Sequence, residues 1–421
     1  MKEKSNTSSN GRRRSLSTKK KLLFFSIVCL FCLFLLYAGT LLARTHGLYG
    51  HLKDNRRGWS APVHEQDSVL GFRPIPGVET SEVFPVGPPV PTRIDDRGFR
   101  VAADAAKEPR GNGPLVMAFG CSFTFGAACR AEDGFPYLVA QRLEGRCINA
   151  GVCSYGLTQM LLRARQLIPK YQPDIVLVQY SPWLVDRALS CYSPTYFGRQ
   201  PVPYFADRGD ELAIQPAPFA ASSIDAQRYD ATPRSLGDYA SFTARAGIPL
   251  MLHDDLWGLT TWLRQRVRAI PPPSGQRQKV VTFVYREFSD LCRAAGATMV
   301  VVILDKGVAS GERESLAAAT DALVVDAHAA LVSRLPVSGP AVHQAMAYQH
   351  RYGHWHGNPP VMVDDHPNEQ AHQIIAAEIV GVVRGPSACH GVRSAASHCS
   401  SRAMPSASSA HRSCAGRTPQ A

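Results

Sequence analysis

Charge of either sign is missing from one long run near the start of the chain, and acidic residues are scarce at both ends. Residues 22–43 contain no Asp, Glu, Lys or Arg. Residues 1–21 hold eight Lys or Arg and a single acid, Glu3, while residues 384–421 hold five Arg and no acid. These two ends account for the whole formal charge of +12, so the residues between them are neutral overall. The body of the chain therefore lacks the basic footprint of a nucleic-acid-binding domain.

The uncharged run is long enough to cross a membrane. A helix rises about 1.5 Å per residue, so residues 22–43 can span a hydrocarbon core about 30 Å thick. A cleaved signal peptide would have a shorter apolar region followed by a small-x-small site, for which Tyr37 to Ala43 is a weak match. Because the basic flank favours the cytoplasm, we predict a cytoplasmic leader over residues 1–21 and an uncleaved anchor over 22–43. Everything after Arg44 is then extracytoplasmic, which means periplasmic in a Gram-negative bacterium.

Two segments that flank the body lack what a packed core requires. Large apolar residues are almost absent from residues 385–421, so we predict a disordered tail over 384–421. Residues 44–113 are dense in proline between Pro74 and Pro91. Such a run favours extended chain without donors for a strand ladder, which predicts a stalk and lead-in.

Strict polar–apolar alternation is absent from the short apolar runs of residues 114–383, which excludes a simple half-exposed sheet. These runs are rich in Val and Ile and alternate with amphipathic segments, which predicts a doubly wound α/β domain. An insertion over residues 190–278 interrupts the pattern, and its apolar part, 247–270, predicts a helix on the core or at the membrane surface. The predicted strands are Leu115–Phe119, Cys147–Ala150, Asp174–Tyr180, Thr298–Leu304 and Ala322–Val325, and the predicted helices are Phe135–Leu143, Leu157–Pro169, Lys279–Ala295 and Glu369–Val383.

A serine follows the first predicted strand on a glycine turn, as Gly120-Cys121-Ser122. A hydroxyl in this position can project above the carboxyl edge of a parallel sheet, where open α/β folds hold their sites. Gly and Ser are also common in ordinary turns, so this stretch alone leaves both interpretations open.

The far end of the chain supplies a base and an acid, in the segment Asp364-Asp365-His366-Pro367-Asn368. A hydroxyl is a poor nucleophile until a base lies within hydrogen-bond reach, and the base needs an orienting group. Ser122, His366 and Asp364 supply these three types of group. Asp365 is the reserve candidate for the orienting acid.

These two blocks together resemble those of the SGNH (GDSL-like) hydrolase family. The family's first block, Gly-Asp-Ser-x-Thr-x-Gly, is matched by residues 120–126 except that Cys121 stands in place of the Asp. Its last block, an Asp shortly before His-Pro-Asn, is matched by residues 364–368. The resemblance covers residues 93–383 and implies a three-layer α/β/α sandwich with about five parallel strands. It also implies that Ser122 is the nucleophile, His366 the base and Asp364 the orienting acid, with no cofactor.

The middle blocks of the family are matched less well. The resemblance implies an oxyanion hole built from the backbone N–H groups of Ser122 and Ser154, where Ser154 replaces a usual Gly. The family's third block usually supplies an Asn side chain, and Trp183 falls at that position. An indole N–H can donate, but its reach differs from that of a carboxamide. Losing one oxyanion donor costs about 10²–10³ in rate, so Trp183 puts full activity in question.

Two other chemistries are open to these residues. His354 and His356 precede His366, and His372 follows it, so a zinc site is conceivable. His366 and His372 also stand where the family's His-Pro-Asn-x-x-x-His pattern places them, and we predict no metal ligands. Cys121 could act as the nucleophile, but the block gives that role to the serine. Six body cysteines could pair outside the cytoplasm, and the sequence does not select the pairing.

Two functions follow from these patterns. The first is a membrane-anchored, extracytoplasmic serine esterase or acyl transferase. Relatives with this topology act on acyl groups of envelope or exported polysaccharides, so the resemblance implies an acylated carbohydrate as the partner and no nucleic acid. The second is a weak or inactive carbohydrate-binding or scaffold protein with the same fold, which Trp183 favours and the retained Ser122, Asp364 and His366 oppose.

Overall fold

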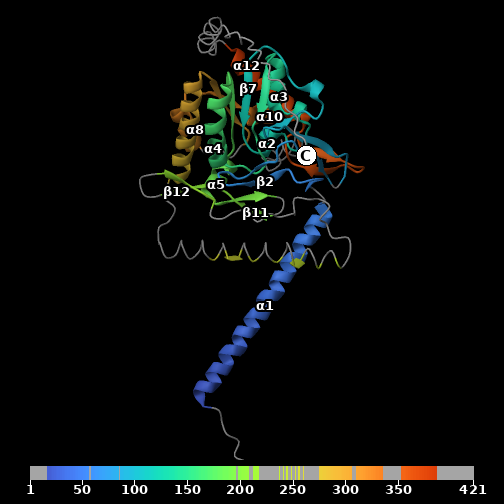
Figure 1. Ribbon diagram of the computed structural model, residues 1–421, viewed down its shortest axis with the longest axis vertical. Coiled ribbons are helices and arrows are strands. Elements are labelled where there is room, and N and C mark those ends of the chain that lie inside the picture. Colours follow the sequence, from blue (N-terminus) through green and yellow to red (C-terminus); the bar gives the residue numbers. More distant parts are fainter. Residues whose placement is uncertain are drawn as a thin grey trace, which may run out of the picture.

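A long helix, α1, projects from an α/β body in the computed structural model (Figure 1). The structure describes residues 17–55, 58–84, 86–195, 198–207, 212–217, 275–305, 310–334 and 352–385, together with scattered residues between 237 and 259. The predictions for most of the leader, for a helix over residues 247–270 and for the disordered tail therefore lie outside the described residues.

The body is built on a nine-stranded sheet of order β1-β4-β5-β6-β8-β7-β9-β14-β15. Its strands from β8 to β15 are parallel, and they confirm the five predicted strands to within one residue at each end. Val and Ile fill both faces of these strands, and all six residues of β9 are buried. The parallel strands are β8 (Arg146–Asn149), β7 (Leu115–Phe119), β9 (Ile175–Tyr180), β14 (Thr298–Ile303) and β15 (Leu323–Asp326).

Helices cover both faces of the sheet, which makes the expected three-layer α/β/α sandwich (Figure 1). On one face α4 packs against α8, and α8 against α9. On the other face α12 packs against α3 and α10. These helices are α3 (Phe135–Arg142), α4 (Leu157–Tyr171), α8 (Gln276–Ala295), α9 (Ser310–Ala319), α10 (Ala327–Ser333) and α12 (Glu369–Arg384).

The order of the parallel strands fixes where a site can form. The chain runs from β7 outward to β8, then crosses to β9 on the other side of β7. The strand order therefore reverses between β7 and β9, and the connections after these two strands diverge. In open α/β sheets the crevice at the carboxyl ends of such a pair is the usual ligand site.

The lead-in is more structured than its proline content suggests. Four of its strands extend the sheet in antiparallel fashion, which corrects the expectation of a stalk without ladder donors. Pro91 has no N–H to donate to a neighbouring strand. It is tolerated because β6 pairs with β5 only at Arg93 and Ile94, so no donor is needed from Pro91 on the edge that faces β6. Trp59 and Ile94 are buried together with Phe125 of the body. The strands are β1 (Gly58–Trp59), β4 (Glu79–Val83), β5 (Val90–Ile94) and β6 (Arg100–Val101).

Shorter elements surround the carboxyl edge of the sheet. Two of them are helices, α2 (Ser122–Phe125) and α5 (Pro182–Leu189), which directly follow β7 and β9. The others are four two-stranded hairpins. They are β2 (His64–Asp67) with β3 (Gly71–Pro74), β10 (Tyr192–Thr195) with β11 (Gly198–Pro201), β12 (Tyr204–Asp207) with β13 (Leu212–Gln215), and β16 (His354–His356) with β17 (Val361–Asp364).

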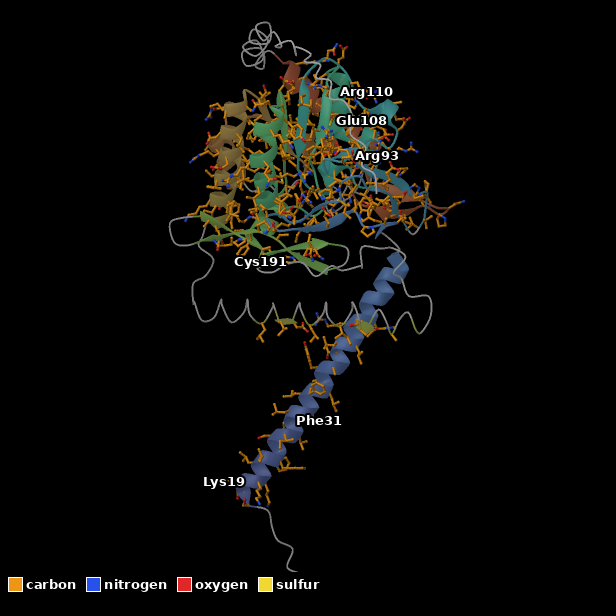
Figure 2. The ribbon with its side chains drawn as sticks, in the orientation of Figure 1. Lys19, Phe31, Arg93, Glu108, Arg110 and Cys191 are labelled. Atoms are coloured by element: carbon orange, nitrogen blue, oxygen red, sulfur yellow. The ribbon has the colours of Figure 1, made fainter. Side chains whose placement is uncertain are left out.

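Helix α1 (Thr18–Asn55) contains the predicted anchor and continues beyond it. It is the one helix in the described part of the chain that is long and apolar enough to cross a membrane. Its large side chains are exposed, as Phe31 shows midway along it, with Lys19 at the end away from the body (Figure 2). The prediction of a single N-terminal span is supported by length and composition.

Candidate active site

The turn from β7 into α2 depends on a glycine. A Cβ on Gly120 would collide with the Thr124 hydroxyl and the Gln179 side-chain carbonyl, so only Gly lets the backbone pass. Ser122 is then the first residue of α2, and the helix closes at Gly126, whose N–H donates to the Ser122 carbonyl. The serine is therefore presented at the carboxyl edge of β7, next to the switch point.

Three predicted side chains meet at this edge although they come from opposite ends of the body. His366 Nε2 lies 2.8 Å from Ser122 Oγ, and His366 Nδ1 lies 2.6 Å from Asp364 Oδ1. A carboxylate can only accept, so Nδ1 carries the proton and Nε2 is left to accept from the serine hydroxyl. The Asp364 side chain is fully buried, whereas 12% of the His366 side chain is exposed. This arrangement has the geometry of a nucleophile, a base and an orienting acid.

The loop that carries His366 is held at both ends. It follows β17, which ends at Asp364, and it leads into α12, whose N-cap is Asn368. The Asn368 side chain accepts a hydrogen bond from the Ala371 N–H at 3.0 Å, which satisfies an orphan donor of the helix. His366 is thereby fixed between a strand and a capped helix.

Asp365, the reserve acid, is not placed for this role. Its Oδ1 lies 3.9 Å from His366 Nδ1, and 61% of its side chain is exposed. A buried carboxylate interacts with the ring much more strongly than a solvated one at greater distance. The structure thus separates the two candidates in favour of Asp364.

The loop that follows β8, residues 149–156, packs against α2. Asn149 Nδ2 donates to the Thr124 carbonyl at 2.9 Å, while its Oδ1 accepts from the Gly151 N–H at 3.0 Å. A Cβ on Gly151 would stand 2.7 Å from the Phe125 nitrogen, which is too close. Asn149 therefore ties α2 to this loop, a role that the sequence analysis did not assign.

Ser154 adopts a left-handed backbone, with φ at +67°. The position thus keeps a conformation that a glycine would take without cost. The Ser154 carbonyl accepts from the Ser193 hydroxyl.

Trp183 is used differently from the Asn that it replaces. Its ring packs edge-on against Phe123, with 5.2 Å between ring centroids, and Phe123 packs in the same way against the His366 ring. Its indole lies near the buried Cys121 thiol and helps to lower the pKa of that thiol. Trp183 therefore supports the walls of the site.

The Cys121 thiol lies next to the serine, with its Sγ 3.8 Å from Ser122 Oγ. Burial alone would raise the pKa of this thiol, but the Arg187 charge and donors from Phe123, Trp183 and Gln179 outweigh burial and lower the pKa. The thiol is completely buried, whereas the serine is partly exposed. This difference in exposure favours the serine over the cysteine as the nucleophile.

Gln179 is a further residue that the sequence analysis missed. Its Oε1 accepts from the Cys121 N–H at 3.0 Å and from the Thr124 hydroxyl at 2.8 Å. Its Nε2 lies 3.2 Å from both Cys121 Sγ and Ser181 Oγ. The sequence did indicate a role for Gln179, because a polar residue within a fully buried strand requires hydrogen-bond partners.

The histidines considered as zinc ligands are not brought together as one site. His372 is buried in α12, where its Nδ1 accepts from the Phe135 N–H at 3.2 Å. His356 is partly exposed in β16, against Gly87. His366 is occupied by the serine and the buried acid. The structure thus separates these three side chains, while His354 joins different neighbours.

Comparison with known proteins yields distant structural matches. No protein-family model matches the sequence, and no curated protein does. Among solved structures, TesA matches with 11% identity and a TM-score of 0.31, covering 64% of this chain and 98% of its own. A protein described as lipolytic and of the G-D-S-L family, from Desulfitobacterium hafniense, matches with 12% identity and a TM-score of 0.30, covering 64% and 98%.

The acetylxylan esterase Axe2 from Geobacillus stearothermophilus, in a catalytic mutant, matches with 13% identity and a TM-score of 0.31, covering 65% of this chain and 96% of its own. At these values the likeness concerns the fold alone.

Proposed function

We propose that this chain is a membrane-anchored serine hydrolase that cleaves or transfers acyl esters. The observation that carries the proposal is the relay from Ser122 through His366 to the buried Asp364, with links of 2.8 and 2.6 Å. The resemblance of the first and last sequence blocks to SGNH hydrolases supports the same chemistry.

The geometry suggests a two-step mechanism. Ser122 Oγ attacks the ester carbonyl while His366 Nε2 accepts the hydroxyl proton, and Asp364 stabilises the imidazolium that forms. The tetrahedral intermediate carries an oxyanion, which the backbone N–H groups of Ser122 and Ser154 stabilise. On collapse, the C–O bond to the leaving alcohol breaks and His366 returns the proton to that alcohol. An acyl-serine ester remains.

The second step reverses the first with a new acceptor. His366 deprotonates a water molecule or a sugar hydroxyl, which attacks the acyl-serine, and Ser122 leaves with the proton from His366. Water gives a free acid, and a sugar hydroxyl gives a new ester. The same three side chains serve either outcome.

We propose an O-acylated glycan outside the cytoplasm as the substrate. The basic residues before α1 favour a cytoplasmic N-terminus, so the body follows the span on the other side. Relatives with this topology in the resembled family act on acyl groups of envelope or exported polysaccharides. An O-acetyl ester is the simplest substrate of this class.

The test is acetate release from an O-acetylated oligosaccharide by the full chain in detergent, with Ser122→Ala as the matched control. We expect the wild-type chain to release acetate and the Ser122→Ala chain to release none. If the enzyme transfers the acyl group, adding an unacetylated acceptor glycan should lower the free acetate and produce a new ester. Glycan binding without turnover by folded wild-type protein would contradict catalysis and favour the carbohydrate-binding alternative.

A further inference from the structure

Three metal-binding side chains meet outside the relay of Ser122, His366 and Asp364. The ligand atoms of Cys129, His354 and Glu369 all lie within 4.8 Å of one another. They come from three distant segments: the loop after α2, the first residue of β16 and the first residue of α12. Cys129 and His354 are buried, while Glu369 is exposed. A buried pair with an exposed carboxylate gives a site that is shaped by the protein and open to solvent.

The spacing suits a tetrahedral metal ion. Cys129 Sγ lies 3.8 Å from His354 Nε2. Zinc bonds of about 2.3 Å to sulfur and 2.0–2.1 Å to nitrogen, at a tetrahedral angle, place these two atoms about 3.6 Å apart. Thiolate, imidazole and carboxylate are also the ligand types that zinc takes in proteins. The observed separation needs only a small adjustment.

Both buried groups lie near one carbonyl oxygen. The Cys129 thiol lies 3.5 Å from the Pro367 carbonyl, and His354 Nε2 lies 3.4 Å from the same oxygen. The two groups therefore share one polar contact. A cation between Sγ and Nε2 would give each of them a strong bond in place of this shared contact.

The surrounding charges favour a cation. The carboxylates of Glu369, Asp133 and Glu82 and the guanidinium of Arg100 all act on the Cys129 sulfur. Three acids and one base leave an excess of negative charge around it. Such an excess attracts a divalent cation, and a bound cation deprotonates the thiol.

We propose that Cys129, His354 and Glu369 bind a zinc ion, with water in the fourth position on the exposed side. Binding replaces the Cys129 S–H bond with an S–Zn bond, and the proton passes to solvent. His354 uses the Nε2 lone pair, with its proton on Nδ1. The ion touches neither Ser122 nor His366.

Such an ion would hold the loop that carries the base. Pro367, whose carbonyl both ligands contact, directly follows His366, and Glu369 begins α12 three residues after His366. A bond network from the Cys129 loop to β16 and α12 therefore encloses this loop. The zinc site is thus a positioning site, and it stands whether or not the chain is an esterase.

The test uses cobalt as a spectroscopic substitute for zinc. The full chain in detergent is freed of metal with a chelator and titrated with Co²⁺. We expect a thiolate-to-cobalt absorption band in the near ultraviolet that saturates at one ion per chain and disappears when Zn²⁺ is added. Cys129→Ser should abolish the band, whereas the matched control Cys153→Ser, at another buried cysteine, should keep it.

A surface variant keeps the test decisive if a core variant fails to fold. Glu369→Gln changes an exposed side chain and should fold, yet it should weaken Co²⁺ binding about 10- to 100-fold. No thiolate band in folded wild-type protein, a band that persists in Cys129→Ser, or unchanged affinity in Glu369→Gln would each overturn the proposal.

Discussion

Asp364 Oδ1 accepts two hydrogen bonds from the same residue, one from His366 Nδ1 and one from the His366 backbone N–H, each at 2.6 Å. The carboxylate turns back along the chain, so a single oxygen fixes both the main chain and the ring. This geometry needs an acid two residues before the histidine. The older form of the family motif has the acid three residues before it, where this chain has Val363, so the two-residue spacing supplies the same contact by a tighter turn.

The first prediction separates the two neighbouring acids. Asp364→Asn should lower kcat for a 4-nitrophenyl ester by about 10⁴-fold, because an amide no longer holds the tautomer that leaves Nε2 free to accept. Asp365→Asn should change kcat less than about threefold, since that carboxylate is exposed and distant. Steady-state kinetics on both variants, with circular dichroism as the check of folding, decide the point. Equal losses in the two variants would contradict the assignment.

The second prediction concerns Trp183. Its ring packs against Phe123 and lies near the Cys121 thiol, so we expect that it does not serve the oxyanion. Trp183→Phe keeps the ring contact with Phe123 and removes only the donor. We expect kcat to fall less than about tenfold, against the 10²–10³ that loss of an oxyanion donor costs. A loss in that larger range, at unchanged stability, would show that the indole donates to the transition state.

The strands of the parallel sheet and the three members of the relay could be predicted from sequence because each depends on local pattern. Val- and Ile-rich runs mark buried strands, and Ser122 and His366 stand in short motifs with fixed neighbours. The support beneath the site could not be predicted in this way. Gln179 and Cys121 meet only after two strands pair, and whether Trp183 turns toward the sulfur or the substrate depends on packing.

The lead-in was misjudged for a related reason. Proline density there argues against a ladder, but a strand can carry Pro91 where its neighbour on that side has ended. The pairing partner decides this, and the local sequence does not contain that information. The same holds for Cys129 and Glu369, whose spacing in the chain gives no sign that they approach His354.

The third prediction tests whether the lead-in belongs to the folded body. Trp59 is buried and packs edge-on against Phe125, with 6.0 Å between ring centroids. Trp59→Ala should lower the free energy of unfolding by about 3–5 kcal/mol, as large-to-small changes in a core do. Val69→Ala, at a position that is 47% exposed, should change it by less than about 0.5 kcal/mol. Urea denaturation followed by circular dichroism measures both, and equal effects would mean that residues before the body do not stabilise it.

The fourth prediction is a loss of stability in mild acid. Burial lowers the pKa of His372 to about 3, with the charges of His354, Arg100 and His366 adding to it, and burial lowers the pKa of His64 to about 4. An unfolded histidine titrates near 6.5. Between these values the unfolded chain binds protons that the folded chain does not. Stability is therefore complete above about pH 6.5 and falls as the pH drops toward 4.

A single substitution isolates the share of His372. In His372→Asn the amide oxygen can still accept from the Phe135 N–H, but the group no longer titrates. The free energy of unfolding is measured for both proteins from pH 7.5 to 4.5. It should fall less steeply in the variant, and below pH 6 the two slopes should differ by about 1.4 kcal/mol per pH unit. Parallel curves for the two proteins would refute a neutral, buried His372.

The central claim is that Ser122 is an activated nucleophile, and labelling with a fluorophosphonate probe tests it most directly. The full chain in detergent is treated with the probe, digested and examined by mass spectrometry, alongside Ser122→Ala and His366→Ala. The account predicts one adduct, on Ser122, that is absent from Ser122→Ala and much reduced in His366→Ala. No adduct on folded wild-type protein, or labelling that persists in Ser122→Ala, would contradict it.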